Sequence, residues 1–449
     1  MKINLDIPLS LSEIAENTGG ILTHADAIVH SLTTDSREAS RGDLFVAIPG
    51  KRMDGNEFAE EARSRGAYVL GNRFASVLIS DASDAILKLV GAYKRRLPFL
   101  IHTVAITGSV GKTTTKELTA RLLSSKYRVH SNLGNFNNDI GLLHTVLSAK
   151  RSTEVLVVEM GMNHSGEISR LSKAARPDTA IITNVGTAHI GNLGSREAIA
   201  MAKLEIADGM RGGIMITPRE EALLHSACPK REVSINNSEG YYSLFVEQID
   251  GESTVFSFNG SSLNLKSERI ALSGEHLMKA LAFALSAADM LCISNDEIMP
   301  ALKSINNECF RQRRIRVGRY DIYDDTYSSS PEAVMAVMRA LIPQSEKGVS
   351  AVLGDMLELG NSTEELHRKV GEAAARCGMR KLYLFGEFAE RIAEGAINAG
   401  MPTDRIFLGE RNGIERTAEQ IQRSYEGELL IVKASHSVHA ERIYDFLKD

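Results

Sequence analysis

Short apolar runs alternate with helical patterns along almost the whole chain. Near the start, runs of strand length occupy residues 43–48, 68–70 and 76–80. A richer series follows at residues 100–107, 155–159, 179–184 and 213–217. Apolar runs separated by segments of helical period are typical of parallel strands covered by helices. The pattern therefore predicts an α/β fold.

The pattern changes twice further along the chain. Residues 233–265 alternate between apolar and polar positions, which indicates a small antiparallel meander. Residues 275–291 form an alanine-rich apolar segment, which predicts a buried helix. A third series of strand-length runs occupies residues 320–325, 350–354, 382–386, 406–408 and 429–433. These changes predict three domains, at residues 1–84, 85–314 and 315–449.

Composition and charge narrow the class of protein. The 449 residues are 43% hydrophobic and 24% charged, which is ordinary for globular domains. A net charge of −5 gives no electrostatic reason to expect a nucleic-acid or membrane partner. No apolar run approaches the roughly 20 residues of a membrane span, and the N-terminal residues lack a signal-peptide core. Four scattered cysteines suit reduced thiols, so we expect a cytoplasmic protein.

The most informative motif is Ile-Thr-Gly-Ser-Val-Gly-Lys-Thr-Thr-Thr-Lys-Glu-Leu, at residues 106–118. Gly108 and Gly111 permit a sharp turn with exposed N–H groups, and the helix that follows favours negative charge at its start. Lys112 would add a positive charge, and Thr113 a hydroxyl ligand for magnesium. The motif is shorter than the usual phosphate loop. Its place between an apolar strand and a helix favours a nucleotide site over an ordinary strand-to-helix turn.

Polar residues also end two other apolar runs of the middle segment. Glu159 follows Val-Leu-Val-Val, Asn184 follows Ala-Ile-Ile-Thr, and His189 lies five residues further on. Parallel strands place ligands at their carboxyl ends, where a glutamate can hold magnesium. The alternative for Glu159 is a helix cap or a partner for a lysine. His189 alone would be read as structural, but its position on the same rim favours a role in the site.

Two further groups have ambiguous patterns. Lys203 lies in a predicted helix at residues 195–209, with Ser195 as its N-cap, and periodicity alone places Lys203 on a solvated face. A turn flanked by glycines contains Asn135, Asn137 and Asn138. Asparagine serves turn geometry as readily as ligand binding, so both interpretations stay open.

In the last segment, paired aspartates end a predicted strand, and serines with Pro331 then give a helix-start signal. The aspartates are Asp324 and Asp325. The junction before this strand is crowded with arginines: Arg311, Arg313, Arg314 and Arg316. Most basic clusters are solvated surface, although a hinge beside a nucleotide site suits an arginine that binds phosphate.

Taken together, these segments resemble the Mur ligase family. The matching motifs cover nearly the whole chain in order: Thr34–Arg37, Leu44–Ala47, Thr107–Thr115, Gly134–Asn138, Glu159–Gly161, Gly166–Ile168, Thr183–Asn184, Ala188–His189, Ala202–Ile206, Asp324–Asp325, Gly354–Gly360, His367 and Val432–Lys433. The short phosphate loop is the form that this family uses. The resemblance implies an ATP-dependent amide ligase whose first domain holds a UDP-sugar. Its central parallel-sheet domain would bind ATP, and its Rossmann-like C-terminal domain the amino substrate.

The resemblance also implies roles for individual residues of the central domain. ATP would be bound by Gly108, Ser109, Gly111, Lys112, Thr113 and Thr114, with Lys112 at the β- and γ-phosphates. Thr113 and Glu159 would hold a first Mg²⁺, and His189 would help to hold a second. Lys203 matches a lysine that carbon dioxide carbamylates, and the carbamate would support the second metal. This role replaces the solvated-face interpretation.

For the substrates, the resemblance implies contacts from all three domains. Asp35, Ser36 and Arg37 would lie near the UDP moiety, and Asn137 and Asn138 on the substrate side of the ATP loop. Asp325 would face the nucleotide. Arg314 would bind phosphate, with Arg311 and Arg313 left open.

Within the family, the resemblance is strongest to ligases of peptidoglycan precursor synthesis. These join D-alanyl-D-alanine to UDP-N-acetylmuramoyl-tripeptide through an acyl phosphate, and a monomer is expected. Two departures leave alternatives open. Ser328 and Ser330 stand where asparagines are expected near the dipeptide, and Ala280 stands where an asparagine would contact adenine. The alternatives are a paralogue that joins a different amine or acid, and a nucleotide-binding protein without ligase activity.

Overall fold

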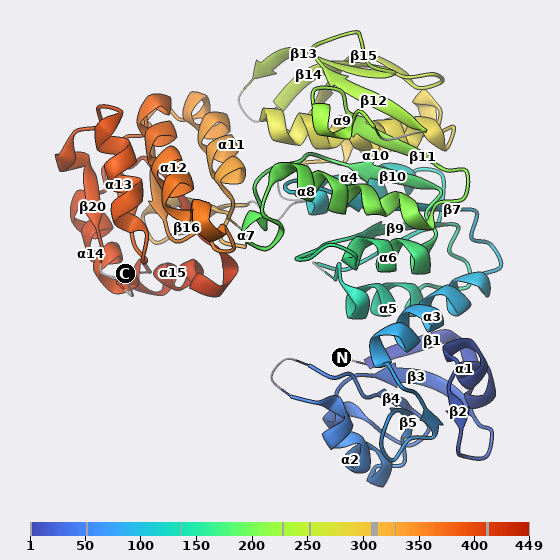
Figure 1. The fold of residues 1–449 in the computed structure, drawn as a ribbon. Coiled ribbons are helices and arrows are strands. Elements are labelled where there is room, and N and C mark those ends of the chain that lie inside the picture. Colours follow the sequence, from blue (N-terminus) through green and yellow to red (C-terminus); the bar gives the residue numbers. More distant parts are fainter. Residues whose placement is uncertain are drawn as a thin grey trace.

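The computed structural model describes residues 2–50, 53–134, 136–226, 229–250, 253–306, 313–327, 329–409 and 413–448, without the side chains of Arg313 and Gln344. Three sheets, each covered by helices, divide this part of the chain into three α/β domains (Figure 1). The predicted fold class is confirmed. None of the helices described combines the length and the apolar composition that a bilayer span requires.

The N-terminal domain contains a six-stranded sheet in the order β1-β3-β4-β5-β6-β2. Its elements are β1 (Lys2–Ser10), α1 (Leu11–Thr18), β2 (Ile21–Leu22), β3 (Ile28–Thr33), β4 (Leu44–Val46), α2 (Ala59–Ser64), β5 (Tyr68–Gly71), β6 (Val77–Leu78) and α3 (Ala82–Arg95). The runs predicted as strands are β4, β5 and β6. Strands β1 and β3 were not predicted, although β1 alternates between exposed and buried positions over most of its length.

The central domain has a nine-stranded sheet in the order β15-β14-β13-β12-β11-β10-β7-β9-β8. The strands are β7 (His102–Thr107), β8 (Val129–Ser131), β9 (Val155–Glu159), β10 (Thr179–Ile182), β11 (Ile214–Pro218), β12 (Lys230–Ile235), β13 (Tyr242–Asp250), β14 (Ser253–Asn259) and β15 (Asn264–Ile270). The antiparallel meander is not a separate sheet. Strand β12 pairs in parallel with both β11 and β13, and only β13, β14 and β15 pair antiparallel, as an extension of the central sheet.

Helices cover both faces of the central sheet. They are α4 (Lys112–Leu123), α5 (Asp139–Leu147), α6 (Glu167–Ala175), α7 (Ile190–Leu193), α8 (Arg196–Leu204), α9 (Glu275–Met290) and α10 (Asn295–Lys303). Helices α4, α9 and α10 pack on one face, and α5, α6 and α8 on the other. Because both faces are buried, the inner strands are continuous apolar runs. The predicted boundary at residues 84 and 85 lies within α3, which packs against α1, α5 and α6.

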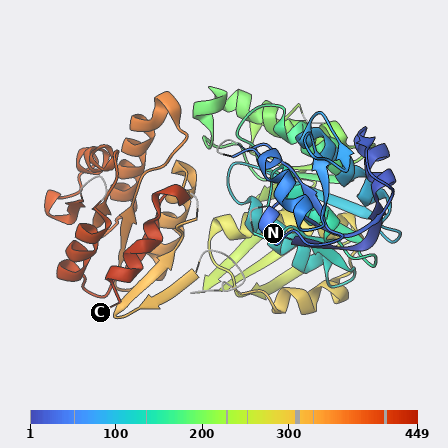
Figure 2. The ribbon, with the colours of Figure 1, turned by 90° about the horizontal axis from the view of Figure 1, so that it is seen from below.

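The C-terminal domain has a six-stranded sheet in the order β16-β17-β21-β18-β19-β20, in which only β16 is antiparallel. Its elements are β16 (Arg313–Val317), β17 (Tyr320–Asp324), α11 (Pro331–Leu341), β18 (Val349–Leu353), α12 (Thr363–Cys377), β19 (Leu382–Leu384), α13 (Ala389–Asn398), β20 (Ile406–Leu408), α14 (Ile414–Ser424), β21 (Leu429–Lys433) and α15 (Ile443–Phe446). Helices α11, α12 and α13 cover one face, and α14 and α15 the other, as in a Rossmann-like fold. Figure 2 shows this domain beside the other two. The predicted boundary at residues 314 and 315 lies within β16.

Candidate functional site

The phosphate loop, residues 108–111, connects β7 to α4 at the carboxyl edge of the central sheet. Strand β7 lies between β10 and β9, so the ends of all three strands meet at this edge. Gly108 has φ +150°, and a Cβ atom there would lie 1.9 Å from Oγ1 of Thr183. Gly111 has φ +82° and forms the N-cap of α4. Both positions therefore need glycine, as the motif predicted.

The residues that follow β10 hold the phosphate loop in place through hydrogen bonds. Oγ1 of Thr183 donates to the carbonyl of Val110 at 2.6 Å. The amide of Asn184 donates to the same carbonyl at 2.9 Å, and its oxygen accepts from the N–H of Val110 at 3.0 Å. On the neighbouring residue, Oγ of Ser109 accepts from the N–H of Gly186 at 2.8 Å. These hydrogen bonds hold the loop in shape.

Lys112 lies over the loop that it follows. Its ammonium donates to the carbonyl of Gly108 at 2.8 Å and to that of Ser109 at 3.3 Å. Burial lowers the pKa of Lys112, and the charge of Glu159 acts in the opposite direction. Thr114 lies in the first turn of α4, half-buried. A positive charge therefore stands at the start of α4, as a phosphate site requires.

Glu159, at the end of β9, joins the phosphate loop to the asparagine turn. Glu159 is buried, with 3% of the residue exposed. Oγ1 of Thr113 donates to one carboxylate oxygen at 2.8 Å, and Nδ2 of Asn137 to the other at 2.8 Å. A hydroxyl and a carboxylate beside a phosphate loop are oxygen donors of the kind that Mg²⁺ prefers. These residues fit the predicted metal, which would take its other ligands from phosphate and water.

The turn that contains Asn137 and Asn138, the asparagine turn, also stabilises the local backbone. Asn138 is the N-cap of α5 and accepts from the N–H of Gly141 at 2.9 Å. The carbonyl of Asn137 accepts from the N–H of Gly161 at 2.8 Å. Asn135 lies outside the described residues. The turn therefore serves backbone geometry, and through Asn137 it also reaches Glu159.

Lys203 and His189 are close enough to Lys112, at the end of the phosphate loop, for its charge to lower their pKa values. Lys203 is 1% exposed, and burial followed by repulsion from Lys112 lowers its pKa well below its usual value. The solvated-face interpretation of Lys203 is therefore wrong. Burial also lowers the pKa of His189, against an opposing effect of Glu358. Within the described part of the chain, the side-chain nitrogen of Lys203 has no hydrogen bond or ion pair.

The residues predicted near the UDP moiety form a compact turn in the N-terminal domain. Asp35 is the N-cap of a short 3₁₀ helix and forms an ion pair with Arg37 at 2.6 Å. Hydrogen bonds from Arg37 lower the pKa of Asp35 to about 2. Oγ of Ser36 donates to Glu61 at 2.8 Å. Arg37 is mostly exposed, and its role in binding UDP stays a prediction.

The structure describes only some of the site residues that were predicted in the C-terminal domain. Asp325 forms a buried ion pair with Lys433 at 2.6 Å. Ser330 is the N-cap of α11. Arg314 is exposed and forms an ion pair with Asp321 of its own hairpin at 2.6 Å, so its phosphate role stays a prediction. Ser328, Arg311 and the side chain of Arg313 lie outside the described residues.

Lys116 is a residue that the sequence interpretation did not assign. It is fully buried in α4, one turn beyond Lys112, and donates to the carbonyl of Asn132 at 2.7 Å and to that of Gly134 at 3.3 Å. The amide oxygen of Asn132 accepts from the N–H of Glu159 at 2.9 Å. Lys116 therefore ties the asparagine turn to the helix of the phosphate loop. The sequence gives no clear signal for this role, because the residues one turn before and after Lys116 are mostly polar, among them Lys112, Thr113 and Thr119.

Replacing Lys116 by methionine is expected to loosen residues 132–138. The carbonyls of Asn132 and Gly134 would each lose a donor, and an unsatisfied buried acceptor costs about 1–3 kcal/mol. Hydrogen exchange should show the free energy of local opening of this turn falling by about that amount. Lys173→Met, at a position with a 63% exposed side chain, is the control. Unchanged exchange in the Lys116 variant would contradict the assigned tie.

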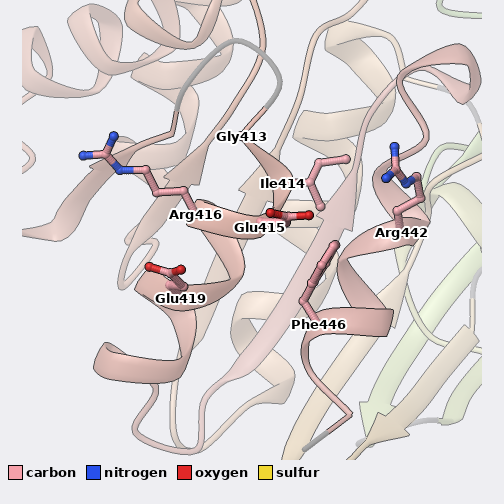
Figure 3. Close-up of a pocket in the computed structure, with 7 residues that line it drawn as sticks. All are labelled: Gly413, Ile414, Glu415, Arg416, Glu419, Arg442 and Phe446. Carbon is pink, nitrogen blue, oxygen red and sulfur yellow. The ribbon is translucent and has the colours of Figure 1, made fainter.

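A separate pocket of about 430 Å³ lies on the C-terminal domain. Figure 3 shows Ile414 and Phe446 between Arg416 and Arg442, which lie on opposite sides. The remaining lining residues are Gly413, Glu415 and Glu419. This pocket contains none of the predicted site residues and mixes both signs of charge. It is not the predicted nucleotide site.

The fold and the site together define a multidomain phosphate-loop protein. Three family models match in order: "Mur ligase family, catalytic domain" over residues 28–105, "Mur ligase middle domain" over 106–288, and "Mur ligase, glutamate ligase domain" over 311–436. The UDP-N-acetylmuramoyl-tripeptide–D-alanyl-D-alanine ligase of Bacillus subtilis is 33% identical, with 97% of this chain and 98% of the relative covered. The chain therefore belongs to the Mur ligase family, whose members are ATP-dependent ligases.

Solved structures agree with this assignment. A crystal structure of MurF from Acinetobacter baumannii matches with a TM-score of 0.87 and 26% identity, covering 100% of both chains. MurF from Thermotoga maritima, in complex with ADP, matches with a TM-score of 0.79 and 29% identity over 93% of this chain and 96% of that one. The predicted three-domain architecture is thus confirmed.

Proposed function

We propose that this protein joins D-alanyl-D-alanine to UDP-N-acetylmuramoyl-tripeptide with ATP, as a monomer in the cytoplasm. The relatives named for this reaction support the choice of substrates. The observation that carries the reaction class is the contact series Thr113–Glu159–Asn137, which joins the phosphate loop to the turn expected beside the acid substrate. This series supports a site in which ATP and the carboxylate that accepts the phosphoryl group would lie side by side.

In the first step, the peptide carboxylate attacks the γ-phosphorus of ATP. ADP departs as the leaving group, and the carboxylate becomes an acyl phosphate. Lys112 places its ammonium over the loop, where it would neutralise charge on the transferred group. Thr113 and Glu159 would hold Mg²⁺, which supplies further charge neutralisation at the phosphates. The hydrogen-bonded loop is already formed, so little reorganisation is needed at the moment of transfer.

Lys203 and His189 would serve the second metal. Burial and the charge of Lys112 lower the pKa of Lys203, which favours the neutral amine; a neutral amine can attack carbon dioxide and lose a proton to give a carbamate. The product would be a negatively charged group near the positive charge of Lys112. The burial of Lys203 and the absence of a partner among the described residues fit this modification.

In the second step, the amine of the dipeptide attacks the acyl carbon, and phosphate leaves from a tetrahedral intermediate. The C-terminal domain contacts the rim through Glu332 and Glu358. Such docking would exclude water, which would otherwise hydrolyse the acyl phosphate.

The direct test is phosphate release by the purified protein with ATP and UDP-N-acetylmuramoyl-tripeptide. We expect release to depend on D-alanyl-D-alanine, with single amino acids and L-alanyl-L-alanine as controls. Release without the dipeptide, or equal release with any amine, would contradict the proposal.

A second candidate is a paralogue of different amine or acid specificity. Ala280 is 3% exposed within the core of the central domain, and Ser330 caps a helix, so neither reproduces the expected asparagine. A panel of amine acceptors separates the two candidates, because strict preference for D-alanyl-D-alanine rejects the paralogue.

A further inference from the structure

The C-terminal domain contacts one short segment of the central domain at every second residue, namely Thr187, His189 and Gly191. The N–H of Thr187 donates to Oε1 of Glu332 at 2.8 Å. Nδ1 of His189 lies 2.5 Å from Oε2 of Glu358, and the N–H of Gly191 donates to the carbonyl of Glu358 at 3.1 Å. Figure 1 shows α7, which begins after His189, extending toward the C-terminal domain. We call residues 184–191 the rim segment.

The rim segment is also the brace of the phosphate loop. Asn184 at its start holds both the N–H and the carbonyl of Val110. Gly186 donates its N–H to Oγ of Ser109, and a Cβ atom on Gly186 would lie 3.1 Å from the carboxyl carbon of Glu332. The contact from the C-terminal domain is therefore one residue away from a contact with the phosphate loop. A displacement at Glu332 has a direct path to Ser109.

The backbones of the two glutamates are anchored in their own domain. Glu358 has φ +65°, in the left-handed region that is unusual for this residue type. Its turn is fixed by the N–H of Met356, which donates to Nε2 of His367 at 3.1 Å, and by the N–H of Leu357, which donates to Oγ of Ser435 at 2.9 Å. Glu332 follows Pro331 in the first turn of α11. Each glutamate is therefore carried by the backbone of the C-terminal domain.

The backbones of the two domains approach each other closely at Gly191 and Gly360, so the contact allows little variation in geometry. A Cβ atom on Gly191 would lie 2.6 Å from the backbone nitrogen of Gly360, so the two turns meet without space for a side chain. The contact is nevertheless not saturated, because Oγ1 of Thr187 and Oε2 of Glu332 are buried without a hydrogen-bond partner among the described residues. An interface that leaves such atoms unpaired is weaker than a fully bonded one. This suits domains that dock and separate during turnover.

From this geometry we infer that Glu332 and Glu358 are positioning residues that transmit docking of the C-terminal domain to the phosphate loop and to His189. Docking sets the backbone of the rim segment through Thr187 and Gly191. Docking also orients the imidazole of His189, because the carboxylate of Glu358 contacts Nδ1. The other ring nitrogen, Nε2, is then left for the site. The catalytic rim is thus complete only when the amino-substrate domain is in place. The consequence for turnover rests on the proposed function, whereas the mechanical coupling does not.

The test combines hydrogen exchange with kinetics on the full-length protein. Glu332→Ala and Glu358→Ala are compared with Glu365→Ala, whose carboxylate lies on α12 of the same domain with a 65% exposed side chain. Loss of one hydrogen bond should speed exchange in residues 184–191 by about 3- to 10-fold, and the effect should extend to residues 108–112. The kcat should fall about 10- to 100-fold, as it does when a group that orients an active-site ligand is removed.

Glu332→Gln supplies the conservative comparison, because an amide oxygen still accepts from the N–H of Thr187. We expect this variant to keep wild-type exchange in both segments. Unchanged exchange in residues 108–112 in both alanine variants would overturn the inference, as would a kcat equal to that of Glu365→Ala. If the wild-type protein itself shows no dipeptide-dependent activity, the proposed function fails, and hydrogen exchange alone decides the coupling.

Discussion

Replacing Lys112 by methionine is expected to lower kcat by about 10²- to 10³-fold, the usual loss when one preorganised donor is removed from a site of developing charge. The ammonium lies on the carbonyls of Gly108 and Ser109, so it is fixed over the loop in which phosphates would lie. Methionine keeps an unbranched stem of similar length and removes only the charge and its donors. The loss should therefore reflect electrostatics rather than a misfolded loop.

The measurement is the kcat of dipeptide-dependent phosphate release at saturating substrates, with hydrogen exchange of residues 108–112 as the check on the loop. Lys369→Met, on the exposed side of α12, controls for removal of one positive charge. We expect kcat and kcat/KM to fall together, because the interaction strengthens as charge moves onto the transferred group. A variant with wild-type kcat would remove Lys112 from the chemistry.

The parts of the site that could be predicted from sequence are those fixed by local rules. Strands β7, β9 and β10 are buried on both faces, so each gives a continuous apolar run that stops where the chain leaves the sheet. The polar residues that end or follow such a run lie at the carboxyl edge. This is why Glu159 and Asn184 were identified from their positions alone. The two glycines of the phosphate loop follow from the same local reasoning.

Contacts between distant segments could not be predicted in this way. Periodicity placed Lys203 on a solvated face, but Lys203 is buried. Its neighbour Glu205 accepts from the N–H of Gly166 at 2.7 Å and from Oγ of Ser165 at 2.8 Å. Glu205 thus caps α6 across about 40 residues of sequence. Nothing near residue 205 in the chain indicates this partner. Only the resemblance to a family pointed to Lys203.

The N-terminal strands show a different limit. Strand β1 pairs with β3 across a register shift between Asn4 and Leu9 and contains Pro8. A proline inside a run argues against a strand unless that strand lies at an edge, and β1 is an edge strand. The position of a strand within its sheet is a property of the whole fold. Contacts between domains, such as those of Glu332 and Glu358, have the same origin.

Replacing Lys203 by alanine is expected to lower kcat by about 10²- to 10³-fold, since several kcal/mol of charge stabilisation at the transferred phosphate would be lost. An unmodified ammonium at this position would be buried beside the positive charge of Lys112, which is unfavourable for both groups. Carbamylation changes the sign of the group and relieves that repulsion. On the proposed mechanism, carbamylation of Lys203 would supply the negative charge, and alanine cannot be modified.

Two measurements separate this role from simple packing. Short carboxylates such as formate or acetate should restore part of the activity of Lys203→Ala, because they fit the space left by the side chain and return a negative charge. Lys203→Gln should be as inactive as the alanine variant but resistant to rescue, since its side chain fills that space. With ¹³C-labelled bicarbonate, the wild-type protein should show a carbamate carbon signal by NMR that both variants lack. If that signal is absent and formate has no effect, Lys203 supports the core of the central domain and takes no part in holding a metal.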